Sequence, residues 1–155
     1  MSKVKVGNKA PTFSLPGTGG EWSSKDQAGS AVVLYFYPKD NTPGCTDESR
    51  QFAALHTQFK KAKAVIVGIS ADSLKAHQNF KEKFDFPFEL LSDADKAVCK
   101  LFDVIQEKSM YGKKYMGIAR STFVIGPNGK IQRIYEKVKP AGHAEEVLEY
   151  LKSSA

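Results

Sequence analysis

The residues best suited to chemistry lie in one stretch, Pro38-Lys39-Asp40-Asn41-Thr42-Pro43-Gly44-Cys45. This stretch follows an apolar run at residues 32–37 and leads into a helical pattern, with Thr42 suited to cap the helix and Pro43 to begin it. Cys45 then falls in the first helical turn, where unpaired backbone N–H groups and the helix dipole favour a negative charge. Because the thiolate is the reactive form of cysteine, we interpret Cys45 as a nucleophile rather than as a plain buried thiol.

The spacing of this stretch resembles a known active-site loop. Pro38-x-x-x-Thr42-x-x-Cys45 resembles the loop of peroxiredoxins, and the fuller run at residues 41–46, with Glu48 following, resembles their bacterioferritin-comigratory, or PrxQ, branch. The resemblance extends over nearly the whole chain. It implies a thioredoxin-like α/β fold, with a central mixed sheet flanked by helices, and a thiol-dependent peroxidase that reduces hydrogen peroxide and organic hydroperoxides through a Cys45 thiolate and sulfenate.

A second motif supplies the cation that such a reaction needs. The run Gly117-Ile118-Ala119-Arg120-Ser121-Thr122-Phe123 resembles the segment that carries the peroxiredoxin arginine. A fixed guanidinium stabilises both a thiolate and the oxyanion that leaves a cleaved peroxide. From the sequence alone, Arg120 could equally be a surface arginine at the start of a strand. The resemblance favours the functional role, so we expect Arg120 to supply the cation.

The remaining members of the expected site lie around Cys45. The Thr42 hydroxyl can approach the sulfur and the peroxide, while Pro38 stiffens the loop and removes a competing donor. Glu48 lies one helical turn from Cys45 and either orients Arg120 or is an ordinary surface glutamate. No metal or cofactor is expected at this site.

The second cysteine leaves the mechanism open. Relatives in this branch carry a resolving cysteine at positions that are Arg50 and Lys81 here, so Cys99 is the one remaining thiol. We therefore expect a one-cysteine mechanism, in which an external thiol (glutathione with glutaredoxin, or thioredoxin) reduces the Cys45 sulfenate. A Cys45–Cys99 disulfide is the alternative, and it requires the two Cα atoms to come within about 7 Å.

Composition limits the other function classes. Hydrophobic residues make up 41% and charged residues 26%, as in soluble globular proteins. The net charge of +6 accompanies no nucleic-acid motif, and we interpret it as scattered surface lysine. The absence of a Cys-x-x-Cys pair counts against a thioredoxin-like disulfide exchanger, and a binding or holdase protein would not depend on Cys45. With no signal peptide or membrane-spanning run, we expect a cytoplasmic monomer.

Hydrophobic patterns predict alternating strands and helices within one domain, residues 1–155. We expect buried strands at 32–37 and 64–69, a small hairpin ending near Trp22, and a second hairpin at 121–135 around Asn128-Gly129. Residues 104–119 are predicted to be a long loop with short strand segments. The expected helices cover residues 43–59, 73–84, 93–102 and 142–152.

Overall fold

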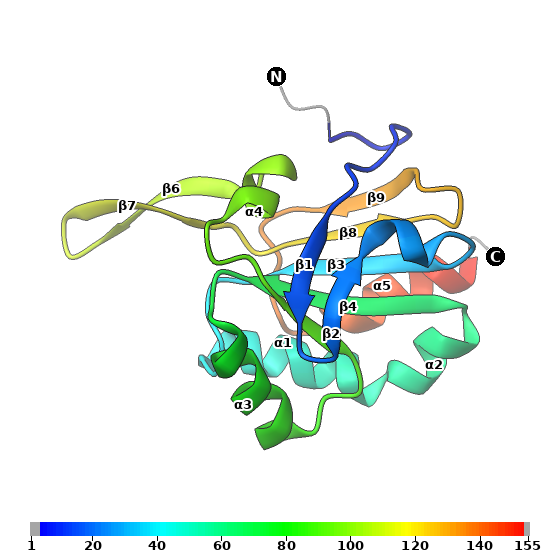
Figure 1. The fold of residues 1–155 in the computed structure, drawn as a ribbon, viewed down its shortest axis with the longest axis horizontal. Coiled ribbons are helices and arrows are strands. Elements are labelled where there is room, and N and C mark those ends of the chain that lie inside the picture. Colours follow the sequence, from blue (N-terminus) through cyan, green and yellow to red (C-terminus); the bar gives the residue numbers. More distant parts are fainter. Residues whose placement is uncertain (1–3, 154–155) are drawn as a thin grey trace.

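The computed structural model describes residues 4–153. Its centre is a seven-stranded mixed sheet in the order β2-β1-β5-β4-β3-β8-β9 (Figure 1). Strands β3, β4 and β5 are parallel, whereas β1 runs antiparallel to β5 and β8 runs antiparallel to β3. The strands are β1 (Ser14–Gly17), β2 (Gly20–Ser23), β3 (Ala31–Phe36), β4 (Ala64–Ser70), β5 (Glu89–Ser92), β8 (Ser121–Ile125) and β9 (Ile131–Tyr135).

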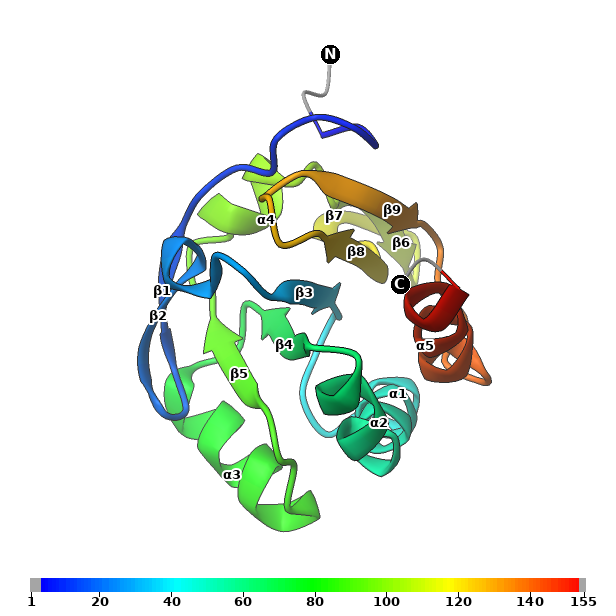
Figure 2. The same ribbon diagram turned by 90° about the vertical axis from the view of Figure 1, so that its right-hand side faces the viewer.

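All six residues of β3 are buried because side chains of successive strand residues point to opposite faces and both faces are covered. Val33 and Tyr35 belong to a core with the helices on one face, while Val32 and Leu34 belong to a second core on the other face. Figure 2 shows the sheet between these two layers, which confirms the predicted mixed sheet flanked by helices.

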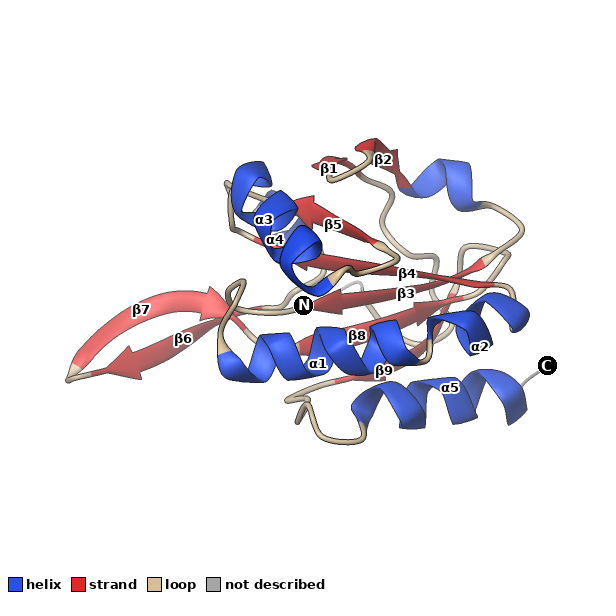
Figure 3. Cartoon of the chain, turned by 90° about the horizontal axis from the view of Figure 1, so that it is seen from below, coloured by secondary structure: helices blue, strands red, loops and turns tan. Residues whose placement is uncertain are grey.

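Three helices cover the first face: α1 (Pro43–Ala54), α2 (His56–Lys61) and α5 (His143–Ser153). In Figure 3, α2 continues the line of α1, and α5 runs alongside them. Helix α3 (Leu74–Phe84) also packs into this core through Phe80, and begins at Ser73, whose hydroxyl accepts from the Ala76 amide as an N-cap. The second face carries α4 (Ala97–Leu101), while a 3-10 turn, η1 (Ser24–Gln27), follows β2.

The predicted single helix over residues 43–59 is wrong. It is two helices, because Leu55 leaves helical geometry with φ −100° and ψ 5°. Phe52 and Phe59 are nevertheless both buried in the same core. The apolar spacing therefore identified the buried face but not the break.

The strand segments expected within residues 104–119 are present, but the segment is a regular hairpin rather than a long loop. Strands β6 (Ile105–Met110) and β7 (Lys113–Ile118) form a separate antiparallel sheet that projects from the body (Figures 1 and 3). Tyr111 and Gly112 make the turn, both with positive φ, at 54° and 78°. Lysine, tyrosine and methionine on exposed strands gave little hydrophobic alternation, so the hairpin signal rested on this one turn.

The two other predicted hairpins are confirmed. Strands β1 and β2 pair from Ser14↔Ser23 to Gly17↔Gly20, with Trp22 buried in the second core. Strands β8 and β9 pair around the Asn128-Gly129 turn. Within residues 4–153, no helix combines the length and the apolar character needed to cross a membrane.

Candidate active site

Cys45 lies in the first turn of α1, at the end of the loop that follows β3, and its side chain is 1% exposed. Pro43 occupies the start of the helix, and the Thr42 carbonyl accepts the first helical hydrogen bond from the Thr46 amide at 2.8 Å. The loop between Pro38, which is half-buried, and Thr42 thus delivers the sulfur to a position between the helix start and the sheet.

Thr42 is the N-cap residue of α1, as predicted, but its side chain makes no capping hydrogen bond. Its hydroxyl instead donates to the Lys39 carbonyl at 2.8 Å. This hydrogen bond joins residues that are three positions apart in the loop. It uses the only proton that the hydroxyl can donate. The Thr42 oxygen retains its acceptor capacity.

Arg120 joins the two motifs in space. It immediately precedes β8, which pairs with β3 through Phe36↔Ser121, so the end of one strand and the start of the other lie side by side. One guanidinium nitrogen, Nη2, lies 3.3 Å from Cys45 Sγ, and the other, Nη1, donates to Glu48 Oε1 at 2.7 Å. Burial disfavours the Arg120 charge, but Glu48 and Cys45 outweigh it, so the pKa of Arg120 lies above its ordinary value.

Glu48 is a fully buried carboxyl, not a surface glutamate. Burial raises its pKa to about 7, although Arg120 opposes the shift. The reason is visible in its contacts, since one oxygen pairs with Arg120 while Oε2 has no hydrogen-bond partner among the described residues. One guanidinium therefore does not compensate for the loss of water around both carboxylate oxygens.

Gly44 allows the guanidinium to approach the sulfur. A Cβ atom added at this position would lie 3.1 Å from Arg120 Nη2 and 3.6 Å from Pro140 Cγ. Arg120 would have to move by a few tenths of an ångström to admit even a methyl group. Glycine is favoured at this position because the Arg120 guanidinium lies close to its Cα atom, and not because of a special backbone angle.

A buried hydrogen-bond network anchors the loop between β3 and α1. The Asp40 carboxylate accepts from the Tyr37 hydroxyl and faces His77 Nδ1, both at 2.6 Å, while the Asp40 amide donates to Asp72 Oδ2 at 2.8 Å. His77 Nε2 donates to the Leu91 carbonyl at 2.8 Å. The sequence pattern placed His77 only on a helix face, and no spacing signal linked it to Asp40.

The same network contains the one three-residue metal-type cluster found within the described chain, formed by Asp40, Asp72 and His77. Asp72 Oδ2 accepts from the Ser70 hydroxyl at 2.6 Å as well as from the Asp40 amide. His77 Nδ1 and Asp40 Oδ2 face each other at 2.6 Å, which is hydrogen-bond distance. The cluster is built from hydrogen bonds, and its effect is to hold the loop.

Cys99 lies on the other face of the sheet. It is buried in α4 within the core that contains Phe36, whereas Cys45 belongs to the core that contains Tyr35. Both thiols are free. The Asp93 carboxylate accepts from the Cys99 amide at 2.7 Å, and burial together with Asp93 raises the pKa of the Cys99 thiol far above its usual value.

Arg50 and Lys81 occupy the positions at which the family resemblance implied a resolving cysteine, and both have charged side chains with partners near the surface. Arg50 is exposed on α1, with its guanidinium 5.9 Å from the centre of the Phe84 ring. Lys81 pairs with Glu89 at 3.0 Å. Neither side chain touches Cys45.

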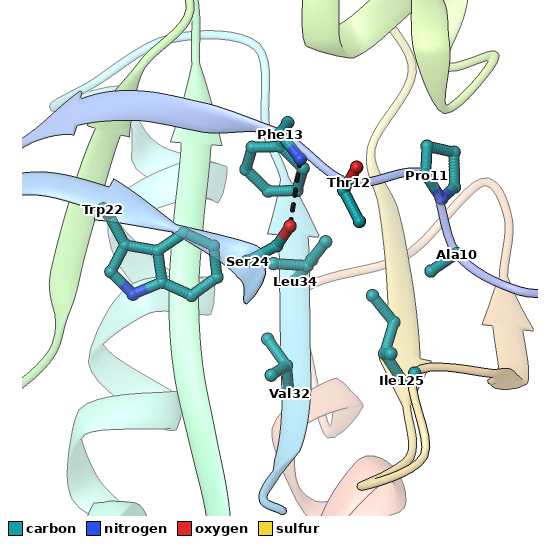
Figure 4. A pocket seen from close by; sticks show the side chains of 10 residues that line it. Ala10, Pro11, Thr12, Phe13, Trp22, Ser24, Val32, Leu34 and Ile125 are labelled. Atoms are coloured by element: carbon teal, nitrogen blue, oxygen red, sulfur yellow. Dashed lines mark hydrogen bonds between the residues drawn. The ribbon is translucent and has the colours of Figure 1, made fainter. Parts of the chain in front are cut away.

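A small apolar pocket lies at the opposite end of β3 from Cys45. Phe13, Trp22, Val32 and Leu34 line its inner wall, with Ala10, Pro11, Thr12 and Ile125 at its edge (Figure 4). The Ser24 hydroxyl accepts from the Phe13 amide at 2.9 Å at its margin. Cys45, Arg120 and Glu48 take no part in it, so it does not belong to the candidate site.

Comparison with known proteins identifies the family. The chain matches the AhpC/TSA family over residues 6–134. Peroxiredoxin Bcp of Escherichia coli K12 is 42% identical over the full length of both chains, and a putative peroxiredoxin bcp of Coxiella burnetii is 51% identical, covering 94% of this chain and 97% of that protein.

Solved structures agree with this assignment. A cysteine-to-serine mutant of Xylella fastidiosa PrxQ superposes with a TM-score of 0.94 at 43% identity over 99% of each chain. The Xanthomonas campestris bacterioferritin comigratory protein, studied for its alkyl peroxide reduction activity, superposes with a TM-score of 0.87 at 50% identity over 92% of this chain and 91% of that one. These neighbours confirm the expected thioredoxin-like fold. The chain belongs to the AhpC/TSA family and, within it, to the Bcp/PrxQ peroxiredoxins, which are thiol peroxidases.

Proposed function

We propose that Cys45 is the peroxidatic residue and that the chain reduces hydrogen peroxide and organic hydroperoxides by a one-cysteine mechanism. The observation that carries this proposal is the contact of Arg120 Nη2 with Cys45 Sγ at 3.3 Å, with Glu48 holding the other end of the guanidinium. The alkyl peroxide reduction described for the Xanthomonas campestris protein supports organic hydroperoxides as substrates.

In the first step the Cys45 thiolate attacks one peroxide oxygen. An S–O bond forms, the O–O bond breaks, and the other oxygen leaves as hydroxide or alkoxide, which takes a proton to become water or an alcohol. Sulfur is oxidised to sulfenic acid and the peroxide is reduced. Arg120 stabilises the thiolate and the departing oxyanion, and the Thr42 oxygen accepts a hydrogen bond from the peroxide.

In the second step an external thiol attacks the sulfenate sulfur. A mixed disulfide forms and water leaves; a second thiol then attacks that disulfide and releases the Cys45 thiolate. The separation of the two cysteines by the central sheet supports an external thiol over Cys99, because a Cys45–Cys99 disulfide would require one residue to cross the sheet layer. We further propose that the whole chain acts as one domain and as a monomer, in the cytoplasm, where thiol reductants are maintained.

Peptide-resolved mass spectrometry tests this mechanism. The reduced protein receives one equivalent of peroxide, with dimedone to trap sulfenic acid, and then glutathione in a parallel sample. We expect the dimedone adduct and the glutathione mixed disulfide on the Cys45 peptide, with the Cys99 peptide unmodified. An abundant Cys45–Cys99 disulfide, together with loss of turnover in Cys99→Ser, would instead establish the two-cysteine alternative.

A further inference from the structure

The β6–β7 hairpin has two chemically different faces. Because strand residues alternate and Lys108 pairs with Tyr115, one face carries Lys108, Lys113 and Tyr115, which we name the basic face. The opposite face carries Glu107, Lys114 and Met116. The hairpin leaves the body beside the start of α1, where Cys45 lies (Figure 3).

The charges of the two faces differ. On the opposite face, Lys114 pairs with Glu107 at 3.5 Å, so its charge is partly compensated. On the basic face, Lys113 is exposed and has no acidic partner within residues 4–153. Tyr115 remains 44% exposed between the two lysines, and large aromatic side chains of this kind are enriched in protein interfaces.

The basic face continues into the active site. Lys108 donates to the Ile118 carbonyl at 2.6 Å, two residues before Arg120. Its side chain lies across Gly117, where an added Cβ would meet Lys108 Cδ at 3.0 Å. The Lys108 ammonium is within electrostatic reach of Arg120 and Cys45, so positive charge extends from the exposed hairpin to the buried sulfur.

We propose that the basic face is the docking surface for the reductant and that its partner is a thiol-carrying protein with an acidic, partly apolar surface around its thiol. This proposal rests on the one-cysteine function above. The surface from Lys113 to Gly117 extends for about 13 Å along β7 before it reaches the site. A strip of that length with an exposed tyrosine fits a protein surface better than a tripeptide such as glutathione.

Docking here would bring the partner's thiol to the sulfenate. The partner thiol attacks the sulfur of Cys45, water leaves, and a mixed disulfide joins the two proteins. A second thiol of the partner then attacks its own sulfur of that disulfide, which releases the Cys45 thiolate and oxidises the partner to a disulfide. The electrons thus come from the partner and the oxygen leaves as water.

Matched lysine variants test the surface. Lys113→Gln and Lys114→Gln each remove one exposed charge from the same strand, but only the first lies on the basic face. Turnover is measured with an acidic thioredoxin, its reductase and NADPH at low and high salt, and again with dithiothreitol, a small neutral dithiol. A third variant, Tyr115→Ser, removes the aromatic contact.

We expect Lys113→Gln and Tyr115→Ser to raise the KM for thioredoxin by on the order of threefold or more, as for interface charge and aromatic losses. The Lys113 effect should shrink at high salt. Lys114→Gln should match the wild type, and all variants should keep wild-type turnover with dithiothreitol. Equal effects of the two lysine variants, or turnover with glutathione but none with thioredoxin, would overturn the docking proposal. A wild-type protein that forms no sulfenate at Cys45 would instead overturn the proposed function.

Discussion

Cys45 and Cys99 are both buried, both lie in helices and both are free thiols, yet their surroundings are opposite in charge. Cys45 faces the Arg120 guanidinium at 3.3 Å in the first turn of α1. Cys99 is enclosed next to the Asp93 carboxylate, which together with burial raises the pKa of its thiol. The cation favours a thiolate in one place and the anion opposes it in the other.

Burial alone therefore does not decide whether the surroundings of a cysteine favour its thiolate. The strand β3 separates the two sites, because its alternate side chains enter different cores. The central sheet thus lies between the two thiols of this chain.

Serine substitutions of the two cysteines should give the largest difference in activity. Cys45→Ser should abolish thiol-dependent peroxide consumption, because serine offers no thiolate at neutral pH. Cys99→Ser should leave turnover close to wild type, and circular dichroism should show both variants folded. Near wild-type turnover in Cys45→Ser would contradict the assignment of the nucleophile.

Removing the positive charge of Arg120 should have the next largest effect on the rate. Arg120→Met should slow the reaction of Cys45 with peroxide by on the order of 10²-fold, the usual loss for one electrostatic donor in an active site. Alkylation of Cys45 by iodoacetamide at neutral pH should also slow, since the thiolate loses its neighbouring charge. Arg133→Met, a surface arginine that lies over Tyr135, is the control. Unchanged kinetics in Arg120→Met would show that the 3.3 Å contact has no role in the reaction.

The Thr42 hydroxyl should contribute less. Thr42→Val removes both the acceptor oxygen and the contact with the Lys39 carbonyl, so peroxide reduction should fall by on the order of tenfold, equivalent to one hydrogen bond. Thr42→Ser keeps the hydroxyl and should retain most activity. Because the hydroxyl does not cap α1, neither variant should show the stability loss of a broken cap. Equal inactivity of the serine and valine variants would rule out hydrogen bonding as the explanation.

The last prediction concerns stability rather than rate. Burial raises the pKa of Glu48 from 4.5 to about 7, so the folded state binds more protons than the unfolded state between those values. Stability from this group is present below about pH 4.5 and is lost as pH rises through about 7, by up to about 3 kcal/mol. In a Cys45→Ser background, Glu48→Gln should therefore flatten urea unfolding free energies between pH 5 and 8. Glu145→Gln, which changes an exposed carboxyl of α5, should keep the wild-type slope.

Sequence reasoning predicted the elements whose signals are local. The apolar run of β3, the amphipathic pattern of α3 and the Asn128-Gly129 turn each depend on residues that are close together in the chain. Arg120 was named through a motif resemblance, since no local pattern predicts that two residues 75 positions apart come within 3.3 Å.

The features that sequence reasoning missed depend on tertiary contacts. Whether Glu48 is buried is decided by what packs over α1, and helical spacing leaves that open. The pairing of Asp40 with His77 joins a loop to α3 across 37 positions. The prediction of a loop at residues 104–119 also gave no basis for assigning faces to β6 and β7.

The anchored loop has a consequence for how a thiol larger than a peroxide gains access to Cys45. Asp40 is tied to Tyr37, Asp72 and His77, and His77 is tied in turn to the Leu91 carbonyl of β5. Because moving the loop would break several of these buried bonds at once, we expect exposure of the sulfur to be a cooperative opening. The opening free energy measured from amide hydrogen exchange at residue 40 should then equal the one measured from alkylation of Cys45. Asp40→Asn should lower these two measured free energies by the same amount.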